Sequence, residues 1–152
     1  MGAKVVVLFF VARNSVASQV VHIADSAEYE RSWYILHTDV GAFCIGLWYR
    51  PPCYGEADST FNLKVEYEQF SVDCIGSIII GDMNVHHKTW LKYSNGTIPE
   101  GRALFDVCCR YGLHQCVQSP TRYSYLLDLV LIDVDALLKT KVLPKVADHN
   151  VV

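Results

Sequence analysis

The chain has 152 residues, of which 51% are hydrophobic and 19% are charged, and its formal net charge is −3. These values are typical of one globular domain with a sizeable core, and they exclude an intrinsically disordered chain. The net charge gives no support to a basic nucleic-acid-binding face, although local patches decide that question. No apolar run is long enough to span a membrane, so we expect no membrane partner.

The six cysteines form neither a C-x-x-C pair nor a zinc-binding spacing. We therefore expect reduced, mostly buried thiols in an intracellular protein, either nuclear or cytoplasmic. Near the N-terminus, Lys4 precedes the apolar residues 5–11, as in a signal peptide. The run is short and Arg13 follows it in place of a small-residue cleavage site, so a buried strand is the better interpretation.

The first half of the chain predicts strands followed by a helix. Residues 19–23 are expected to form a short strand, and residues 33–37 and 43–49 flank a turn at 39–41, which predicts a hairpin. The prolines at 51–52 end the second hairpin strand, because proline cannot donate a hydrogen bond to a sheet.

A helix is expected next, with Asp58 or Ser59 as its N-cap and Gly76 as its end. Four apolar residues with helical spacing define its buried face: Leu63, Tyr67, Phe70 and Cys74.

The second half of the chain predicts further strands, loops and one more helix. Asn95-Gly96 is a turn signal, and Gly112 suits the C-terminal cap of a helix. The expected elements are strands over 78–80, 113–117 and 125–132, a loop over 90–99, a helix over 100–111 and a turn over 119–122. Mixed strands and helices favour packed sheets with helices outside.

The apolar strand at 78–80 ends at a glycine and delivers four polar side chains to the edge of the sheet, namely Asp82, Asn84, His86 and His87. A simple polar turn is the alternative interpretation, because Gly, Asp and Asn are common turn residues. Adjacent residues on an extended segment point in opposite directions, so the two histidines do not suit a zinc pair. We expect them to have a structural or a substrate-contacting role.

Asp128 lies on an otherwise apolar strand. A carboxylate buried there is costly unless a partner compensates it, and the imidazole of His149 is the best candidate. Such a carboxylate would fix the tautomer of the histidine and stabilise its charged form. An exposed edge strand is the alternative. Together with Asp82, Asn84 and Asp148, this pair suits a hard cation such as Mg²⁺ and the stabilisation of an attacked phosphate.

These motifs resemble the endonuclease/exonuclease/phosphatase superfamily, which includes DNase I, and most closely the endonuclease domain of non-LTR (LINE-type) retrotransposons. The resemblance implies a four-layer α/β fold in which two packed mixed sheets are flanked by helices. The matching stretches, in order, are Leu47-Trp48-Tyr49-Arg50-Pro51-Pro52, residues 80–90, Ser119-Pro120-Thr121-Arg122, Leu127-Asp128-Leu129-Val130-Leu131, and Ala147-Asp148-His149.

The resemblance also implies roles for individual residues in Mg²⁺-dependent nicking of DNA, with Mn²⁺ as an alternative metal. Asp82 would activate the attacking water or position it beside the metal. Asn84 would hydrogen-bond the scissile phosphate. His149, oriented by Asp128, would stabilise the charge that develops on that phosphate.

Further roles are implied around this centre. Asp148 would belong to the metal shell, Tyr49 would reach the phosphate from a neighbouring strand end, and Thr121 would support the site. Weaker candidates for contact with the substrate are Arg50, His86, His87 and Arg122. Burial of Tyr49 in the core is an alternative to its catalytic role. DNA is the implied partner, together with a reverse transcriptase domain in the full-length element.

The sequence also departs from the family pattern. The family opens with strands that carry an asparagine and a metal-binding glutamate, whereas Asn14, Glu28 and Glu30 lie in the wrong context. We therefore expect residues 1–152 to be a single but partial domain, with weakened Mg²⁺ binding and poor or no activity in isolation. Alternatives are a non-catalytic remnant, a nucleic-acid-binding fragment, and a phosphatase or phosphodiesterase of the same fold.

Overall fold

The computed structural model describes residues 20–26, 29–52, 57–134, 140–146, 149–150 and 152. The strand expected at residues 5–11 and the proposed metal ligand Asp148 lie outside these ranges, so both stay predictions. Among the described helices, neither has the length and apolar character needed to cross a membrane.

The described residues form a six-stranded mixed sheet in the order β1-β2-β3-β4-β6-β5. Strands β3 and β4 are parallel and are connected through helix α1, whereas the other neighbours in the sheet are antiparallel. The elements are β1 (Val20–Asp25), β2 (Arg31–Thr38), β3 (Gly41–Trp48), α1 (Ala57–Phe70), β4 (Gly76–Asp82), α2 (Pro99–Tyr111), β5 (His114–Gln115), β6 (Asp128–Ile132), β7 (Lys145–Val146) and β8 (His149–Asn150).

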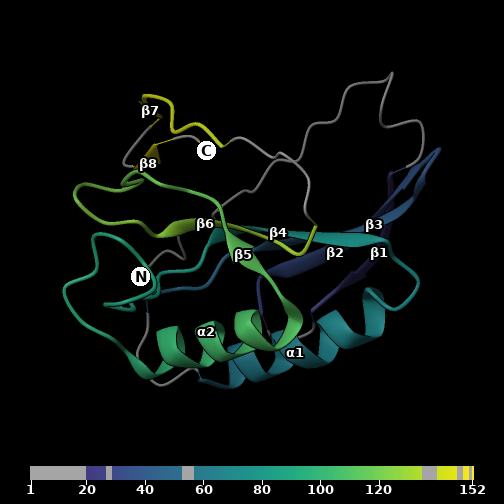
Figure 1. The fold of residues 1–152 in the computed structure, drawn as a ribbon, viewed down its shortest axis with the longest axis horizontal. Coiled ribbons are helices and arrows are strands. Elements are labelled where there is room, and N and C mark those ends of the chain that lie inside the picture. Colours follow the sequence, from purple (N-terminus) through teal and green to yellow (C-terminus); the bar gives the residue numbers. More distant parts are fainter. Residues whose placement is uncertain (1–19, 27–28, 53–56, 135–139, 147–148, 151) are drawn as a thin grey trace, which may run out of the picture.

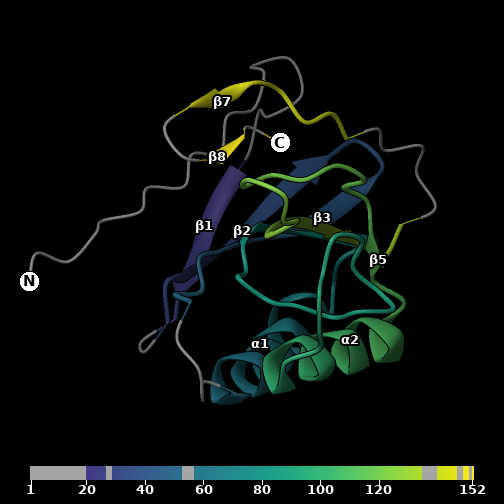
Figure 2. The same ribbon diagram turned by 90° about the vertical axis from the view of Figure 1, so that its left-hand side faces the viewer.

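Both helices cover one face of this sheet, and the small β7–β8 hairpin lies on the other side (Figures 1 and 2). The architecture is therefore α/β, as expected. In the described part of the chain, the second sheet consists of β7 and β8 alone.

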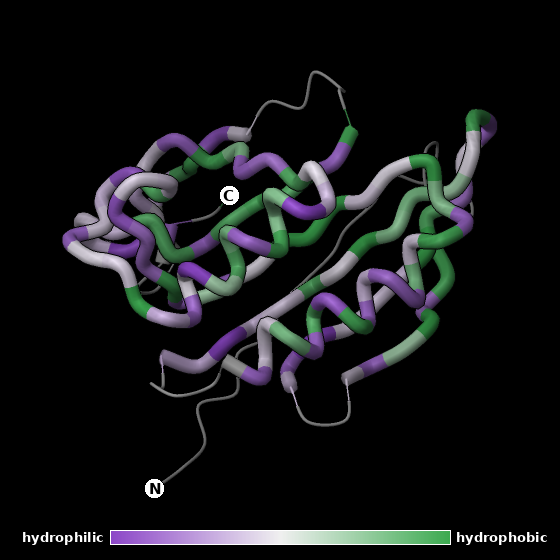
Figure 3. The backbone as a smooth tube through the Cα atoms, turned by 60° about the horizontal axis from the view of Figure 1, so that its bottom comes forward, coloured by the Kyte–Doolittle hydropathy of each residue, from purple (hydrophilic) through white to green (hydrophobic). Residues whose placement is uncertain are grey.

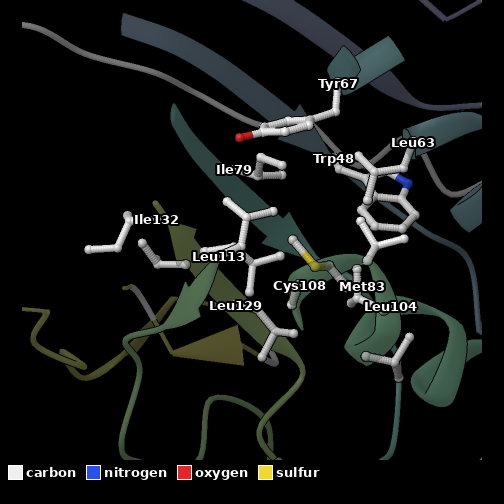
Figure 4. Packing of buried hydrophobic residues seen from close by; sticks show 14 of the residues in the cluster. Trp48, Leu63, Tyr67, Ile79, Met83, Leu104, Cys108, Leu113, Leu129 and Ile132 are labelled. Carbon is white, nitrogen blue, oxygen red and sulfur yellow. The ribbon is translucent and has the colours of Figure 1, made fainter. Parts of the chain in front are cut away.

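The core lies between the central strands and the two helices (Figure 4). Strand β6 is buried on both faces from Leu129 to Ile132, as its continuous apolar run requires. Hydrophobic stretches along the central strands contrast with alternating hydrophobic and hydrophilic positions along the helices (Figure 3). Burial of these alternating apolar positions fixes each helix against the sheet.

Helix α2 matches the prediction closely. Pro99 stands in its first turn, where the missing N–H costs nothing, and Gly112 ends it in the left-handed region with φ of 67°. The Gly112 N–H donates to the carbonyl oxygen of Cys108. The buried face includes Leu104 and Val107.

The predicted ends of helix α1 were wrong. The helix begins at Ala57, so Asp58 and Ser59 lie in its first turn, and it ends at Phe70, before Cys74 and Gly76. The Ser71 hydroxyl and the Ser71 backbone N–H both donate to the Tyr67 carbonyl oxygen, at 2.6 and 3.0 Å. The Cys74 N–H then donates to the Ser71 carbonyl oxygen at 3.0 Å, in a turn. Gly76 is instead the first residue of β4, where it pairs with Phe43.

Strand β6 is shorter than predicted, because it begins at Asp128 and not at Tyr125. The Thr121 hydroxyl oxygen accepts the backbone N–H groups of Leu127 and Asp128 at 3.1 and 3.0 Å. The N–H groups of Leu127 and Asp128 are therefore bound by a loop residue and not by a neighbouring strand. Tyr125 pairs instead with Arg122 in a tight turn.

Candidate active site

Two carboxylates meet where β4 ends and β6 begins. Asp82 is the last residue of β4, Asp128 is the first of β6, and the antiparallel register pairs them directly. Opposed residues in such a pair have Cβ atoms only about 5 Å apart. Asp82 is 7% exposed and Asp128 is half-buried. Carboxylate oxygens on adjoining strands are the kind of ligand that a hard cation prefers.

Asn84 follows at a backbone position with φ of 45°. Asparagine tolerates this left-handed region better than most residues. Its Nδ2 donates to the Arg50 carbonyl oxygen at 2.9 Å, and the Arg50 backbone N–H donates to the Asp82 carbonyl oxygen at 2.8 Å. The end of β3 and the loop after β4 therefore hold each other in place.

The Arg50 side chain also holds the loop that carries Asn84. Its Nη1 donates to the Asn84 carbonyl oxygen at 3.1 Å, and its Nη2 lies 3.4 Å from Oε1 of Glu100. Arg50 is only 1% exposed. This corrects the prediction that Arg50 contacts substrate at the rim of the site, because its guanidinium is turned into the protein and positions the loop.

Thr121 connects the remaining motifs. Besides accepting two N–H groups with its hydroxyl, it accepts the backbone N–H of Asn150 at its carbonyl oxygen, at 2.6 Å. Asn150 also donates from Nδ2 to the Pro120 carbonyl oxygen at 3.1 Å. Strand β8, which contains His149, is thereby attached to the loop that holds Asp128. The side chain of His149 lies outside the described part of the structure, so its pairing with Asp128 stays a prediction.

The two adjacent histidines have different environments. His87 is 5% exposed, its ring centroid lies 4.8 Å from that of Phe105, and its Nδ1 accepts the Trp90 backbone N–H at 3.2 Å. These contacts favour the structural role for His87. His86 is partly exposed and lies edge-on to Tyr125. Burial lowers the pKa of His86, which favours its neutral form at neutral pH.

Tyr49 and Arg122 are both half-buried near this edge. The backbone N–H of Tyr49 donates to the Glu30 carbonyl oxygen at 2.8 Å. The Arg122 guanidinium lies 6.0 Å from the centre of the Tyr123 ring. Their contacts with a substrate stay predictions.

A divalent cation is compatible with the kind of donors present, since carboxylate and amide oxygens from Asp82, Asn84 and Asp128 come from adjoining segments. Within the described residues, however, no three His, Cys, Asp or Glu side chains are grouped closely enough to hold a metal ion. The residues therefore fit Mg²⁺ by chemistry, while the described part of the chain does not by itself complete a set of protein ligands.

The model of a family described as endonuclease-reverse transcriptase matches residues 44–152. This chain belongs to that family. The match includes all the stretches on which the predicted resemblance rests, from residue 47 to residue 149.

A solved structure shares the fold of this chain. The chain is similar to the endonuclease domain of TRAS1, a telomere-specific non-LTR retrotransposon, with a TM-score of 0.63 and 20% sequence identity. The similarity covers 79% of this chain and 60% of that chain. It confirms the predicted DNase I-like fold. No curated protein matches the sequence.

Sequence reasoning missed two residues at the site of this family member. Glu100 is 1% exposed and accompanies Arg50, but an acidic residue in the first turn of a helix usually indicates only a favourable helix dipole. Tyr125 is predicted in a strand, although its carbonyl oxygen accepts the N–H of Thr121 at 2.9 Å in a turn. The signal available in the sequence for a turn at Tyr125 was Tyr123-Ser124-Tyr125, which follows the turn at Pro120.

Proposed function

We propose that this chain is the endonuclease domain of a non-LTR retroelement and that it nicks one strand of DNA in a Mg²⁺-dependent reaction. The observation that carries the proposal is one continuous set of hydrogen bonds and strand pairings. It joins Arg50, Asp82 and Asn84 on one side to Asp128, Thr121 and Asn150 on the other. Segments far apart in the sequence thus present their polar residues at one edge of the sheet.

In the proposed reaction, the oxygen of a water molecule attacks the phosphorus, and the bond to the leaving ester oxygen breaks. Asp82 orients and activates the water, and Asn84 donates a hydrogen bond to the scissile phosphate. Asp128 orients His149, which stabilises the developing negative charge. The Thr121 hydroxyl oxygen accepts the backbone N–H of Asp128 and so keeps Asp128 in place.

Two further groups complete the proposed site. Tyr49 reaches the phosphate from the end of β3, and Asp148 contributes to the metal shell. A bound Mg²⁺, or Mn²⁺ in its place, would supply neutralisation of the charge on the phosphate. Glu28 and Glu30 do not match the family's metal glutamate, so we expect the isolated chain to bind Mg²⁺ weakly and to nick slowly.

We also propose the biological setting that such a domain implies. The partners are DNA and a reverse transcriptase domain of the same element, and the location is intracellular, either nuclear or cytoplasmic.

The test is nicking of supercoiled plasmid by the purified chain, with Mg²⁺ and with EDTA. We expect nicking only with Mg²⁺, and a fall of about 100-fold or more in the His149→Ala variant, because a group that stabilises transition-state charge is lost. The matched control is His37→Ala, since His37 is an exposed histidine of β2.

Four results would contradict this proposal. Nicking that persists in EDTA would exclude the metal, and nicking by His149→Ala at the wild-type rate would exclude the assigned role. A folded chain that never nicks favours the non-catalytic remnant, and turnover of a phosphomonoester without nicking favours the phosphatase.

A further inference from the structure

A small cavity lies beside the proposed site, on the side of the loop that follows Asn84. Its volume is about 220 Å³, which is below the roughly 300–1,000 Å³ of pockets that hold drug-sized ligands. This size suits a single ring system. The lining residues are His86, Asn95, Gly96, Thr97, Ile98 and Tyr125.

The polar and aromatic groups of this cavity, which we call the His86–Tyr125 pocket, are held in a defined arrangement. The rings of His86 and Tyr125 lie edge to face, with their centroids 5.3 Å apart. Asn95 Nδ2 donates to the Tyr125 hydroxyl at 3.3 Å. The Ile98 N–H donates to the His86 carbonyl oxygen at 3.1 Å, which fixes the loop that carries Asn95.

Both walls of the pocket are attached to segments of the proposed active site. On one wall, His86 follows Asn84 by two residues. On the other wall, the Tyr125 carbonyl oxygen accepts the N–H of Thr121 at 2.9 Å, and Thr121 in turn holds Asp128. The two walls of the pocket are therefore continuous with the segments that carry Asn84 and Asp128.

The chemistry of the lining favours a flat heteroaromatic ligand over an anion. Among the residues that the structure describes, no lysine or arginine lines the pocket, so these residues offer no fixed positive charge for a phosphate. The two rings offer stacking faces, which bind any nucleobase. Asn95 offers both an amide donor and an amide acceptor, the combination that distinguishes base edges by hydrogen bonding.

We propose that the His86–Tyr125 pocket receives a nucleobase next to the scissile phosphate, and that Asn95 and Tyr125 determine which base is preferred there. This inference rests on the proposed function, because the pocket would give the proposed nicking site its preference for a DNA sequence. It makes Asn95 and Tyr125 specificity residues with no part in bond cleavage.

The test is to sequence the plasmid nicks and to measure the base preference at the positions flanking them. A preference is a ratio within one reaction, so it does not depend on the overall nicking rate. We expect Asn95→Ala and Tyr125→Phe to reduce the preference about tenfold, the worth of one good base contact. Asn95→Ala should be made first, because Asn95 is exposed and its truncation leaves the core intact.

The matched control is Asn62→Ala, because Asn62 Nδ2 donates to the Tyr29 hydroxyl at 3.2 Å in an equivalent pair that does not line the pocket. If Asn95→Ala keeps the wild-type base preference, as the control should, the inference about the pocket is overturned. The proposed nicking function would still stand. Nicking without base preference in the wild type would overturn it too. An absence of both nicking and duplex binding, the latter measured by fluorescence anisotropy in EDTA, would remove the proposed function and the pocket with it.

Discussion

At the scale of single residues, the buried Arg50–Glu100 pair decides the shape of the loop that carries Asn84. Both side chains are almost fully buried, at 1% and 2% exposure, and Arg50 also donates to the Asn84 carbonyl oxygen. A buried charge without its partner is costly, whereas replacement of both partners by apolar residues is often tolerated. The pair is therefore coupled, and its two members should not be independent in mutagenesis.

We predict that Arg50→Met lowers the free energy of unfolding by about 3–5 kcal/mol, because Glu100 is left buried without its counterion. Urea unfolding followed by circular dichroism measures this loss. The double variant Arg50→Met/Glu100→Leu should be less destabilised than the sum of the single variants. Arg110→Met, at an exposed arginine of α2, is the control. Strict additivity of the two changes would exclude the coupling.

At the scale of elements, the site depends on how closely β3 and β4 approach at their ends. Gly81 stands immediately before Asp82, and a Cβ atom added to it would lie 1.6 Å from the Trp48 carbonyl oxygen. That contact is with backbone, so no side-chain rotation can relieve it. The glycine therefore lets the strand that carries Asp82 pass beside the strand that leads to Arg50.

We predict that Gly81→Ala costs at least about 3 kcal/mol of stability, because the two strands must separate to make room for the methyl group. Thermal unfolding monitored by circular dichroism would show the change. Gly96→Ala is the matched control, since a Cβ atom there meets nothing within 4 Å. Equal melting temperatures for the two variants would refute the role of close strand approach.

At the scale of the whole molecule, the helical layer is fixed to the sheet by polar contacts as well as by the core. Glu66 of α1 accepts hydrogen bonds from Arg31 Nε at 2.7 Å and from Trp33 Nε1 at 2.6 Å, both on β2. Burial raises the pKa of the Glu66 carboxyl, but the hydrogen bonds from Arg31 and Trp33 outweigh that effect. They hold the pKa below its ordinary value of 4.5.

Because the pKa of Glu66 is lowered in the folded state, its contribution to stability is present above pH 4.5. It is lost as the pH falls through the lower, folded-state value. We predict that Glu66→Gln is less stable than the wild type near neutral pH and has a flatter decline in acid. Urea unfolding across this pH range is the measurement, with Glu30→Gln at an exposed carboxylate as the control. Parallel acid limbs for wild type and Glu66→Gln would contradict the assignment.

The sequence by itself determined the kinds of elements and the family. The continuous apolar runs at 78–80 and 129–132, the hairpin around 39–41 and the helix ending at Gly112 are local patterns, and each is present in the structure. Motif order sufficed to indicate the endonuclease-reverse transcriptase family. Periodicity and turn chemistry act over a few residues, which is why they could be recognised without coordinates.

Only the tertiary structure decided where elements end and what the charged residues contact. Helix α1 stops at Phe70, and Gly76 pairs with β3. Strand β6 starts at Asp128, and the Thr121 hydroxyl binds the backbone N–H of Leu127, the residue before that strand. Arg50 turned out to be buried, and the pocket at Tyr125 depends on loops 30 residues apart. Such contacts depend on segments distant in the chain, whose meeting is fixed by the packing of the whole sheet rather than by local pattern.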